Sequence, residues 1–396
     1  MRYIMITGGS LVNKGAQAMI YVTVCEMKKR FPDKEILVVM DLNGIPKEAD
    51  LNNFNFSIVG NSVIGREALF WLGGIWSLRA LKRGVNKREL FKVRKIWKNT
   101  DYVMDISGFA IGKKWGTLRS CQTAMKAALA KKFHAHCIFL PQSFGPFDYK
   151  TDEKEVLQTR QVLKKWLSDA DVLYAREALG KQMLEELGLE NVKLAQDIVL
   201  QNKEYDVNMI YKNPPAVRPV EIKEKSVGLI PNKHVASSMN NDVYVLWDAA
   251  IAKLLEQGYT VYLLIHDNSD LQIIRTLKER HKEENRIILL ENDFSCIEYN
   301  ELVKKFDFMI ASRYHSIVHA YRNLIPCVVL GWADKYGVLL EAMNQLRYNL
   351  DLRKEVSERE LLQCIEHMAR SLEENTGLIQ DRLKEVQKEN VFDALQ

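Results

Sequence analysis

The sequence predicts an α/β protein made of two Rossmann-like domains that face each other across a cleft. Short apolar runs of strand length alternate with helical segments in both halves of the chain, and polar residues gather directly after the strands. The length of 396 residues also exceeds what one hydrophobic core usually serves. Ligands of open parallel sheets bind beyond the carboxyl ends of the strands, so we expect a ligand between the domains.

The N-terminal domain is expected over residues 1–200. Its helices are predicted at 16–30, at 117–133 and in a segment ending at Gly188. Its strands, each a short apolar run, are predicted at 3–7, 35–40, 102–106, 136–140, 172–175 and 192–194.

A linker is expected over residues 201–224, because this polar stretch contains three of the nine prolines. The C-terminal domain should then cover 225–372. A terminal helix is expected over 373–396, and its return to the N-terminal domain is left open. The second series of strands is predicted at 226–230, 260–265, 286–290, 308–311 and 325–330.

The most informative stretch follows the strand predicted at 308–311. Ser312, Arg313 and His315 stand where this strand becomes a helix, and Lys335 follows the next strand. Free backbone N–H groups and the positive end of a helix dipole favour anions at such a junction. The pattern therefore indicates a site for a small, highly charged anion. A histidine that merely caps a helix is the structural alternative for His315.

Other polar residues occupy the corresponding places after other strands. A tight turn between strand and helix is the structural alternative for Asn13 and Lys14, and a pair with Glu177 or Asp197 is the alternative for Arg176. These candidate substrate-binding residues are Asn13, Lys14, Gln142, Ser143, Arg176 and His266.

Residues 67–98 form a basic insertion rich in tryptophan. The segment holds nine Lys and Arg residues against two Glu, with five aromatic residues interleaved. Basic groups beside tryptophans suit an anionic membrane surface or a lipid-linked phosphate. A helical hairpin with a solvated basic face is the structural alternative.

The composition sets limits on the class of protein. The chain is 47% hydrophobic and 27% charged, with a formal net charge of +5. Its six cysteines form no CxxC pair, which favours a reducing, cytoplasmic compartment and argues against a structural zinc site. We expect no signal peptide, no membrane-spanning helix and no metal.

The motifs taken in order resemble those of the polysaccharide pyruvyltransferase family. The resemblance rests on Gly8-Gly9 with Asn13-Lys14-Gly15-Ala16, Pro141-Gln142-Ser143-Phe144-Gly145-Pro146, Ala175-Arg176-Glu177, Asp197, Ser312-Arg313-Tyr314-His315 and Ala333-Asp334-Lys335. It extends from Tyr3 to about Asn344 and implies a fold similar to that of GT-B glycosyltransferases. It also implies transfer of pyruvate from phosphoenolpyruvate to a sugar as a ketal. The basic insertion matches no motif of that family.

The resemblance assigns the family's arginine-x-histidine motif to Arg313 and His315, with Arg176 and Lys335 as further cations for phosphoenolpyruvate. His315 is then the candidate general acid, because an unperturbed histidine titrates near neutral pH. The general base is left open among Asp105, Asp197 and the His266–Asp267 pair. No cofactor is expected beyond phosphoenolpyruvate as the donor substrate.

The acceptor is expected to be a sugar, and a polyprenyl diphosphate carrying it would bring the enzyme to the inner face of the membrane through residues 67–98. No nucleic acid is expected as a partner. Two rival functions remain open from the sequence. One is a GT-B-type glycosyltransferase that uses a nucleotide sugar, and the other is a basic module that binds nucleic acid or membrane without catalysis.

Overall fold

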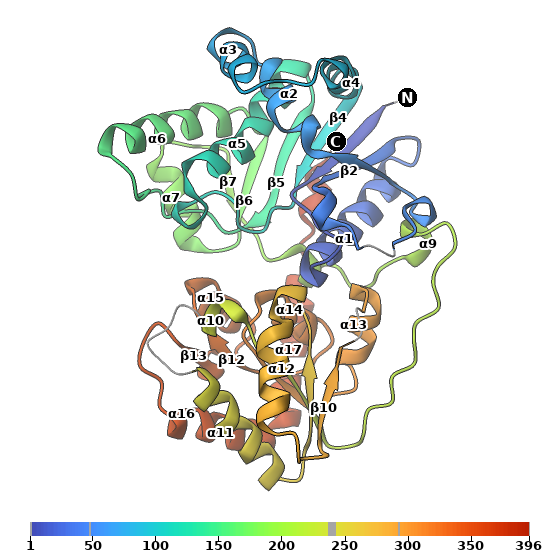
Figure 1. The fold of residues 1–396 in the computed structure, drawn as a ribbon, viewed down its shortest axis with the longest axis vertical. Coiled ribbons are helices and arrows are strands. Elements are labelled where there is room, and N and C mark those ends of the chain that lie inside the picture. The colour runs from blue at the N-terminus through green and yellow to red at the C-terminus, as the bar shows by residue number, and fades with distance from the viewer. Residues whose placement is uncertain (1, 47–48, 237–242, 292–293, 396) are drawn as a thin grey trace.

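A computed structural model describes residues 2–46, 49–236, 243–291 and 294–395. The chain forms two α/β halves, each built on a parallel sheet, and one half lies above the other in Figure 1. The first half contains the strands up to residue 194, and the second contains those from residue 226 onward. The arrangement is GT-B-like, as the sequence predicts.

The first sheet has seven parallel strands in the order β3-β2-β1-β4-β5-β6-β7. Such an order places β1 and β4 side by side at the centre, where successive strands stop being added on one side of β1 and begin to be added on the other. The strands are β1 Tyr3–Thr7, β2 Glu35–Met40, β3 Ser57–Gly60, β4 Thr100–Asp105, β5 His136–Gln142, β6 Val172–Ala175 and β7 Val192–Leu194.

Helices cover both faces of this sheet, and three of them come from the basic insertion. The helices of the first half and of the linker are α1 Lys14–Arg30, α2 Arg66–Phe70, α3 Gly74–Lys82, α4 Lys87–Lys98, α5 Gly116–Phe133, α6 Glu153–Leu167, α7 Ala178–Glu186, α8 Ile198–Gln201 and α9 Val207–Ile210.

The second sheet has six parallel strands in the order β10-β9-β8-β11-β12-β13. These are β8 Ser226–Ile230, β9 Thr260–Leu264, β10 Ile287–Leu290, β11 Phe308–Ala311, β12 Cys327–Gly331 and β13 Asn349–Asp351. Its helices are α10 Lys233–Ala236, α11 Val243–Glu256, α12 Leu271–Arg280, α13 Cys296–Val303, α14 Tyr314–Arg322, α15 Asp334–Ala342, α16 Glu358–Arg370 and α17 Leu372–Val386.

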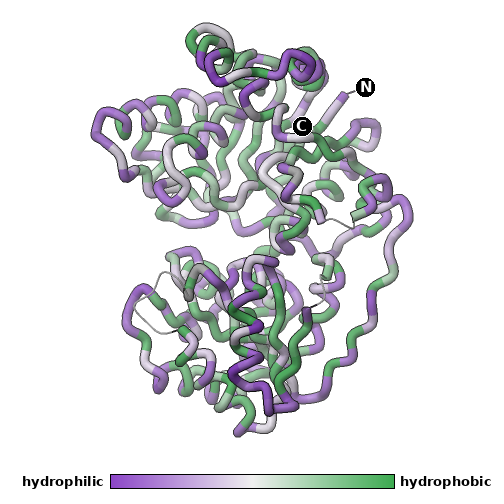
Figure 2. Tube along the Cα trace, in the orientation of Figure 1, coloured by the Kyte–Doolittle hydropathy of each residue, from purple (hydrophilic) through white to green (hydrophobic). Residues whose placement is uncertain are grey.

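Both sheets are buried on both faces, as parallel sheets usually are. Every residue of β8, β9, β11 and β12 is buried, so these strands carry apolar runs in place of alternating polar residues. Figure 2 shows the same hydrophobic interior in each half, with polar residues on the outer turns. Because these apolar runs are continuous, the sequence predicts the bounds of these strands closely.

Several elements lie outside the sequence prediction. The short edge strands β3 and β13 carry no strong apolar run, and α6 was not predicted. Pro141 and Gln142, predicted to lie in a loop, belong to β5. Proline donates no ladder hydrogen bond, and the register between β5 and β6 shifts at this point.

The linker is only partly extended. Asp206 caps the short helix α9, and the Tyr211 hydroxyl lies 2.6 Å from that of Tyr21 on α1. Residues 201–211 therefore pack on the first half, and the chain crosses to the second half only after them.

The end of the chain returns to the first half. Val391 donates a backbone hydrogen bond of 3.0 Å to Gln201, and Asn390 contacts Glu26 on α1. Phe392 is buried in this contact, beneath the Arg30 guanidinium. Figure 1 accordingly shows the C-terminus beside the upper half.

Candidate active site

The centre of the site is the junction between β11 and α14. Ser312 is fully buried, and its hydroxyl donates to the Ile230 carbonyl at 3.1 Å. Its own carbonyl accepts hydrogen bonds from Asn232 and Tyr336, each at 2.9 Å. Ser312 thus holds the junction together, and its hydroxyl is engaged by the protein backbone.

Arg313 is anchored by a buried carboxylate. Its Nε and Nη2 atoms donate to the two oxygens of Asp270 at 2.7 and 2.6 Å, and Nη2 also reaches Ser269 at 3.2 Å. A bidentate pair of this kind fixes the plane of the guanidinium. Arg313 is therefore a held cation, with 15% of its side chain exposed.

Arg176 is buried at the end of β6 and faces the second half. Its Nη1 atom donates to Asp197 at 2.8 Å, while Nη2 donates to the Gly108 carbonyl at 2.8 Å and to Ser143 at 3.0 Å. The guanidinium stacks over the Tyr314 ring at 4.4 Å, so it also contacts α14. Ser143 in turn donates to Glu177 at 2.8 Å.

His315 lies at the start of α14, with its Nε2 atom 3.5 Å from Asp197 and 15% of its side chain exposed. Burial lowers the pKa of His315, and Asp197 offsets part of that effect. Burial alone would raise the pKa of Asp197, but His315 and Arg176 hold it well below its usual range. One buried carboxylate therefore connects the imidazole of one half to the arginine of the other.

Gly15 makes room for His315. It lies at the start of α1, and a Cβ added there would overlap the His315 ring. The close approach of α1 to α14 across the two halves therefore depends on glycine.

Lys335 stands at the start of α15 among aromatic rings. Its ammonium lies 5.2 Å from the centre of Tyr314 and 5.9 Å from that of Phe109, which belongs to the first half. Burial, together with the charge of Arg176, lowers the pKa of Lys335 to about 7. The ammonium of Lys114, from the first half, lies 3.8 Å from the centre of the Trp332 ring. Within the described ranges, neither Lys335 nor Lys114 forms an ion pair.

Asn13 joins the two halves. Its side chain caps α1 by accepting from Ala16, and it donates to Asp267 of the second half at 2.7 Å. Lys14 is buried beside it.

His266 is buried, and its ring packs against the rings of Tyr299 and His319. Burial lowers the pKa of His266 far below its ordinary value and that of His319 to about 3. Burial therefore favours the neutral form of both imidazoles.

Gln142 is fully buried and donates to Asp105 at 3.1 Å. Asp105 also forms an ion pair with the buried Lys126, which holds the pKa of Asp105 below its usual range even though burial would raise it. Asp267 accepts from Asn13 and Ser269. All three carboxylates that the sequence offers as a base thus already have donors.

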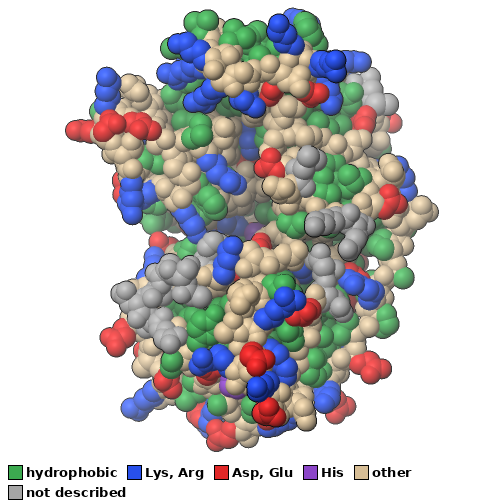
Figure 3. Space-filling model, viewed as in Figure 1, with side chains coloured by type: hydrophobic (Ala, Val, Ile, Leu, Met, Phe, Trp, Pro, Cys, Tyr) green, Lys and Arg blue, Asp and Glu red, His purple; other side chains and the backbone are tan. Residues whose placement is uncertain are grey.

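The structure therefore brings Arg176, Arg313, His315 and Lys335 together around Tyr314, at the contact between the halves. Figure 3 shows a hollow between the halves, with Lys and Arg side chains on its walls. The sequence analysis quotes Gly15 and Tyr314 as motif residues but gives them no role. It missed Lys114, and it missed Asp270, which stands after the strand at 260–265 as the other site residues stand after theirs. Among the residues with described positions, no three His, Cys, Asp or Glu side chains are grouped to hold a metal ion.

The family model described as "Polysaccharide pyruvyl transferase" matches residues 13–334 of this chain. A search among curated proteins found no significant match.

Solved structures show the same fold at low sequence identity. MnaA of S. aureus with UDP has a TM-score of 0.58 and 12% identity, with coverage of 96% of this chain and 91% of that one. The UDP-GlcNAc 2-epimerase of Methanocaldococcus jannaschii has a TM-score of 0.55 and 12% identity, with 92% of each chain covered. HepE of Anabaena in complex with UDP-glucose has a TM-score of 0.54 and 13% identity, with 98% and 95% covered.

Proposed function

Because this chain belongs to the polysaccharide pyruvyl transferase family, we propose that it uses phosphoenolpyruvate as donor and forms a pyruvate ketal on a sugar. In this reaction the enolpyruvyl carbons move to two sugar hydroxyls and inorganic phosphate is released. The sugar belongs to a precursor of a cell-surface polysaccharide or exopolysaccharide.

The observation that carries this proposal is the cluster of cationic side chains around Tyr314, in which the Lys335 ammonium is left without a carboxylate partner among the described residues. Arg176 is paired with Asp197 at 2.8 Å and with Glu177 at 3.9 Å, and Arg313 is paired with Asp270, whereas Lys335 forms no ion pair within the described ranges. Phosphoenolpyruvate carries a carboxylate and a phosphate on a very small skeleton, so it would balance this charge. Burial is the main cause of the lowered pKa of Lys335, and the positive charge of Arg176 lowers it further, so a bound anion would favour the charged ammonium.

His315 supplies the proton in this proposal. It gives a proton to the methylene carbon of the donor, which becomes a methyl group and leaves an oxocarbenium-like centre. One sugar hydroxyl adds to that centre and returns a proton. The second hydroxyl then attacks the same carbon and closes the ketal ring. Phosphate leaves and accepts the proton of that hydroxyl.

The protonation state of His315 must change when the donor binds. Burial lowers the pKa of His315 and so favours the neutral imidazole in the free protein. The negative charges of bound phosphoenolpyruvate raise the pKa of His315 again, so that the acid forms in the complex.

The proposed acceptor is linked to a polyprenyl diphosphate, and the enzyme works in the cytoplasm at the inner face of the membrane. Ile75, Leu78 and Leu81 on α3 are each at least half exposed and stand among Arg79, Lys82 and Arg83. An apolar and basic face of this kind suits an anionic bilayer surface. No helix among the described residues is both long and apolar enough to cross a bilayer.

The test is incubation of the protein with phosphoenolpyruvate and a panel of sugar acceptors. Phosphate release that depends on an acceptor, with a product heavier by the pyruvate ketal, is the expected result. His315→Ala should reduce the rate by about 100- to 10,000-fold, the usual contribution of a general acid. The matched control is His281→Ala, which removes a histidine paired with Asp248 far from the site.

Release of UDP or GDP from a nucleotide sugar, with no reaction of phosphoenolpyruvate, would overturn the proposal in favour of glycosyl transfer. Equal rates for His315→Ala and the wild-type protein would remove His315 as the acid.

A further inference from the structure

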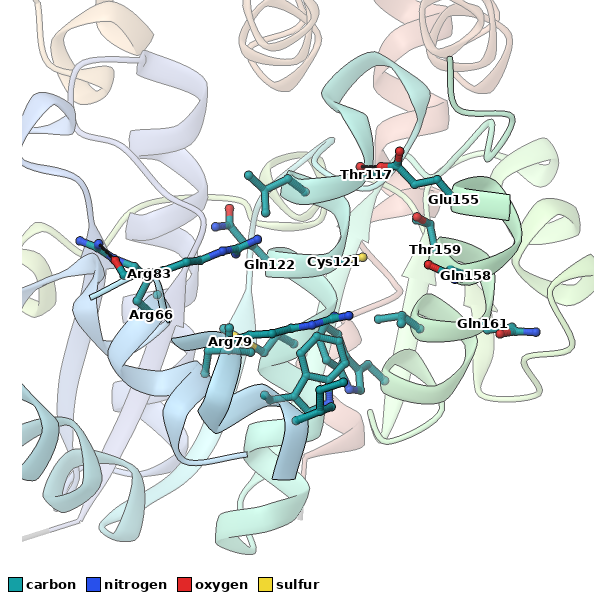
Figure 4. A pocket seen from close by; sticks show the side chains of 18 residues that line it. Arg66, Arg79, Arg83, Thr117, Cys121, Gln122, Glu155, Gln158, Thr159 and Gln161 are labelled. Carbon is teal, nitrogen blue, oxygen red and sulfur yellow. Dashed lines mark hydrogen bonds between the residues drawn. The ribbon is translucent and has the colours of Figure 1, made fainter. Parts of the chain in front are cut away.

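A groove of about 590 Å³ opens between the basic insertion and the body of the first half. Its walls are α2 and α3 on one side and α5 and α6 on the other (Figure 4). The groove lies outside the cluster around Tyr314, and the reaction described above uses none of its residues.

One wall of the groove is cationic. Arg79 and Arg83 extend from the α3 side towards α5 in Figure 4, and Arg66 lies beside them. Arg66 is held by donating to the Arg83 carbonyl at 2.8 Å. None of the three arginines forms an ion pair within the described part of the chain. This wall can therefore receive negative charge from a ligand.

The opposite wall offers little competing charge. Glu155 is the one carboxylate among the lining residues, and its oxygens accept hydrogen bonds from Thr117, at 2.9 Å, and from Thr151.

The floor of the groove is apolar. The ring centres of Trp76 and Trp166 lie 4.7 Å apart. The guanidinium carbon of Arg79 lies 4.8 Å from the centre of the Trp76 ring. Ile75 and Leu118 also line the groove, and they are 58% and 56% exposed. Apolar side chains exposed in a cavity gain free energy when a hydrocarbon ligand covers them. A small free anion would leave them in water.

The groove continues towards the donor site. A second cavity of about 440 Å³ shares Gly65, Leu118 and Gln122 with it. That cavity lies beyond the ends of β1 and β4 and reaches Ser107. The next residue, Gly108, accepts the hydrogen bond from Arg176.

We propose that the groove binds the diphosphate and the first isoprene units of a polyprenyl-diphosphate-linked acceptor, and that the second cavity receives its sugar. Arg79 and Arg83 contact the diphosphate, while Trp76, Ile75 and Leu118 cover the isoprene chain. This inference rests on the proposed function, because it places the acceptor of that reaction. The exposed apolar residues of α3 beside the groove give the remaining chain a short path to the bilayer.

The test uses farnesyl diphosphate as a soluble probe, titrated into the full-length protein by calorimetry, with inorganic pyrophosphate and farnesol as comparison ligands. We expect farnesyl diphosphate to bind at least tenfold more tightly than either. The double variant Arg79→Gln/Arg83→Gln should weaken its binding at least tenfold. Ile75→Ser should weaken the binding of farnesyl diphosphate but not that of pyrophosphate.

The matched control is Lys87→Gln/Arg88→Gln, which removes two charges from the same insertion but outside the groove. It should change the affinity by less than twofold. All exchanged side chains are exposed, so thermal melting should show every variant folded. Equal affinities for pyrophosphate and farnesyl diphosphate, or equal losses in the two double variants, would overturn the inference.

A separate measurement of phosphoenolpyruvate binding distinguishes this inference from the proposed function. If phosphoenolpyruvate binds and farnesyl diphosphate does not, only the acceptor site is wrong. If phosphoenolpyruvate neither binds nor releases phosphate with any acceptor, the proposed function itself fails.

Discussion

The protein environment has opposite effects on the charges of Lys335 and Asp197 at the site. Lys335 is a cation whose surroundings disfavour its charge, and Asp197 is an anion whose charge is stabilised by neighbours from both halves. A bound anion would stabilise the charged form of Lys335, whereas the Asp197 carboxylate is already paired within the protein. Their substitutions should therefore affect different properties, namely ligand affinity and folding stability.

Phosphoenolpyruvate affinity should depend on pH through Lys335. The free protein loses the ammonium charge as the pH rises through the pKa of about 7. Because the charged form binds the anion better, we expect the affinity to fall by about tenfold or more between pH 6.5 and 8.5. Lys335→Gln should bind weakly and show a smaller fall, as measured by calorimetry across this range, because only the protonation of His315 on binding then remains to make the affinity depend on pH. Lys113→Gln, which removes a lysine paired with Asp148, should keep the wild-type profile.

Asp197→Asn should destabilise the fold by about 3–5 kcal/mol, since it removes the closer of the two carboxylates paired with the buried Arg176. Asparagine can still cap α8, so the effect isolates the charge. The folded-state pKa of Asp197 is lowered, so its stabilisation is present above the unfolded pKa of about 4 and is lost as the pH falls below it.

Chemical denaturation at several pH values measures this effect. The gap between the wild-type protein and Asp197→Asn should be constant from pH 6 to 8 and shrink in acid. A gap that stays unchanged at pH 3 would contradict the assignment of the effect to this charge.

The site depends on how α1 of the first half meets α14 of the second. Asn13 bridges the two halves through Asp267, and Gly15, two residues later, lies against His315. The start of one helix therefore both joins the halves and positions the candidate acid.

Gly15→Ala should displace His315 and lower the rate of phosphate release by about tenfold or more, with a smaller effect on phosphoenolpyruvate affinity. Gly377→Ala is the matched control, because Gly377 also lies in a helix but has no neighbouring atom within 4 Å of an added Cβ. That control should keep full activity and gain up to about 1 kcal/mol of stability. Equal activity in both variants would show that the α1–α14 contact does not position His315.

At the scale of the whole molecule, the basic insertion lies at the end of the first half that is farthest from the second half (Figure 1). An enzyme held to a bilayer by this end would keep its donor site open to the cytoplasm. The C-terminal segment ties the second half back to the first through Phe392 and Val391, so both halves would be carried together.

Vesicles containing anionic lipid should float the protein at low salt, and Arg79→Gln/Lys82→Gln/Arg83→Gln should reduce the floated fraction several-fold, since each basic residue near such a surface contributes about 1 kcal/mol. Lys282→Gln/Lys304→Gln/Lys384→Gln removes the same charge from the second half and should float normally. Equal flotation of the two triple variants would exclude the insertion as the membrane contact.

The sequence by itself determined the two-domain α/β fold, because interior parallel strands must be apolar on both faces and so appear as short unbroken runs. It also located Arg176, Arg313, His315 and Lys335 as candidates, since each lies within a few residues of the end of a predicted strand. Edge strands such as Ser57–Gly60 and Asn349–Asp351 escaped the prediction, because they lie at the sheet margins and carry no such run.

Only the tertiary structure decided which partner each of these residues has. Arg313 is held by Asp270, and Arg176 shares Asp197 with His315, through contacts that depend on how strands and whole domains dock. The lowered pKa of Lys335 likewise requires burial next to another cation, which no local sequence pattern encodes. The groove beside the insertion has the same origin, because α3 and α6 meet only when residues far apart in the chain are brought together by folding.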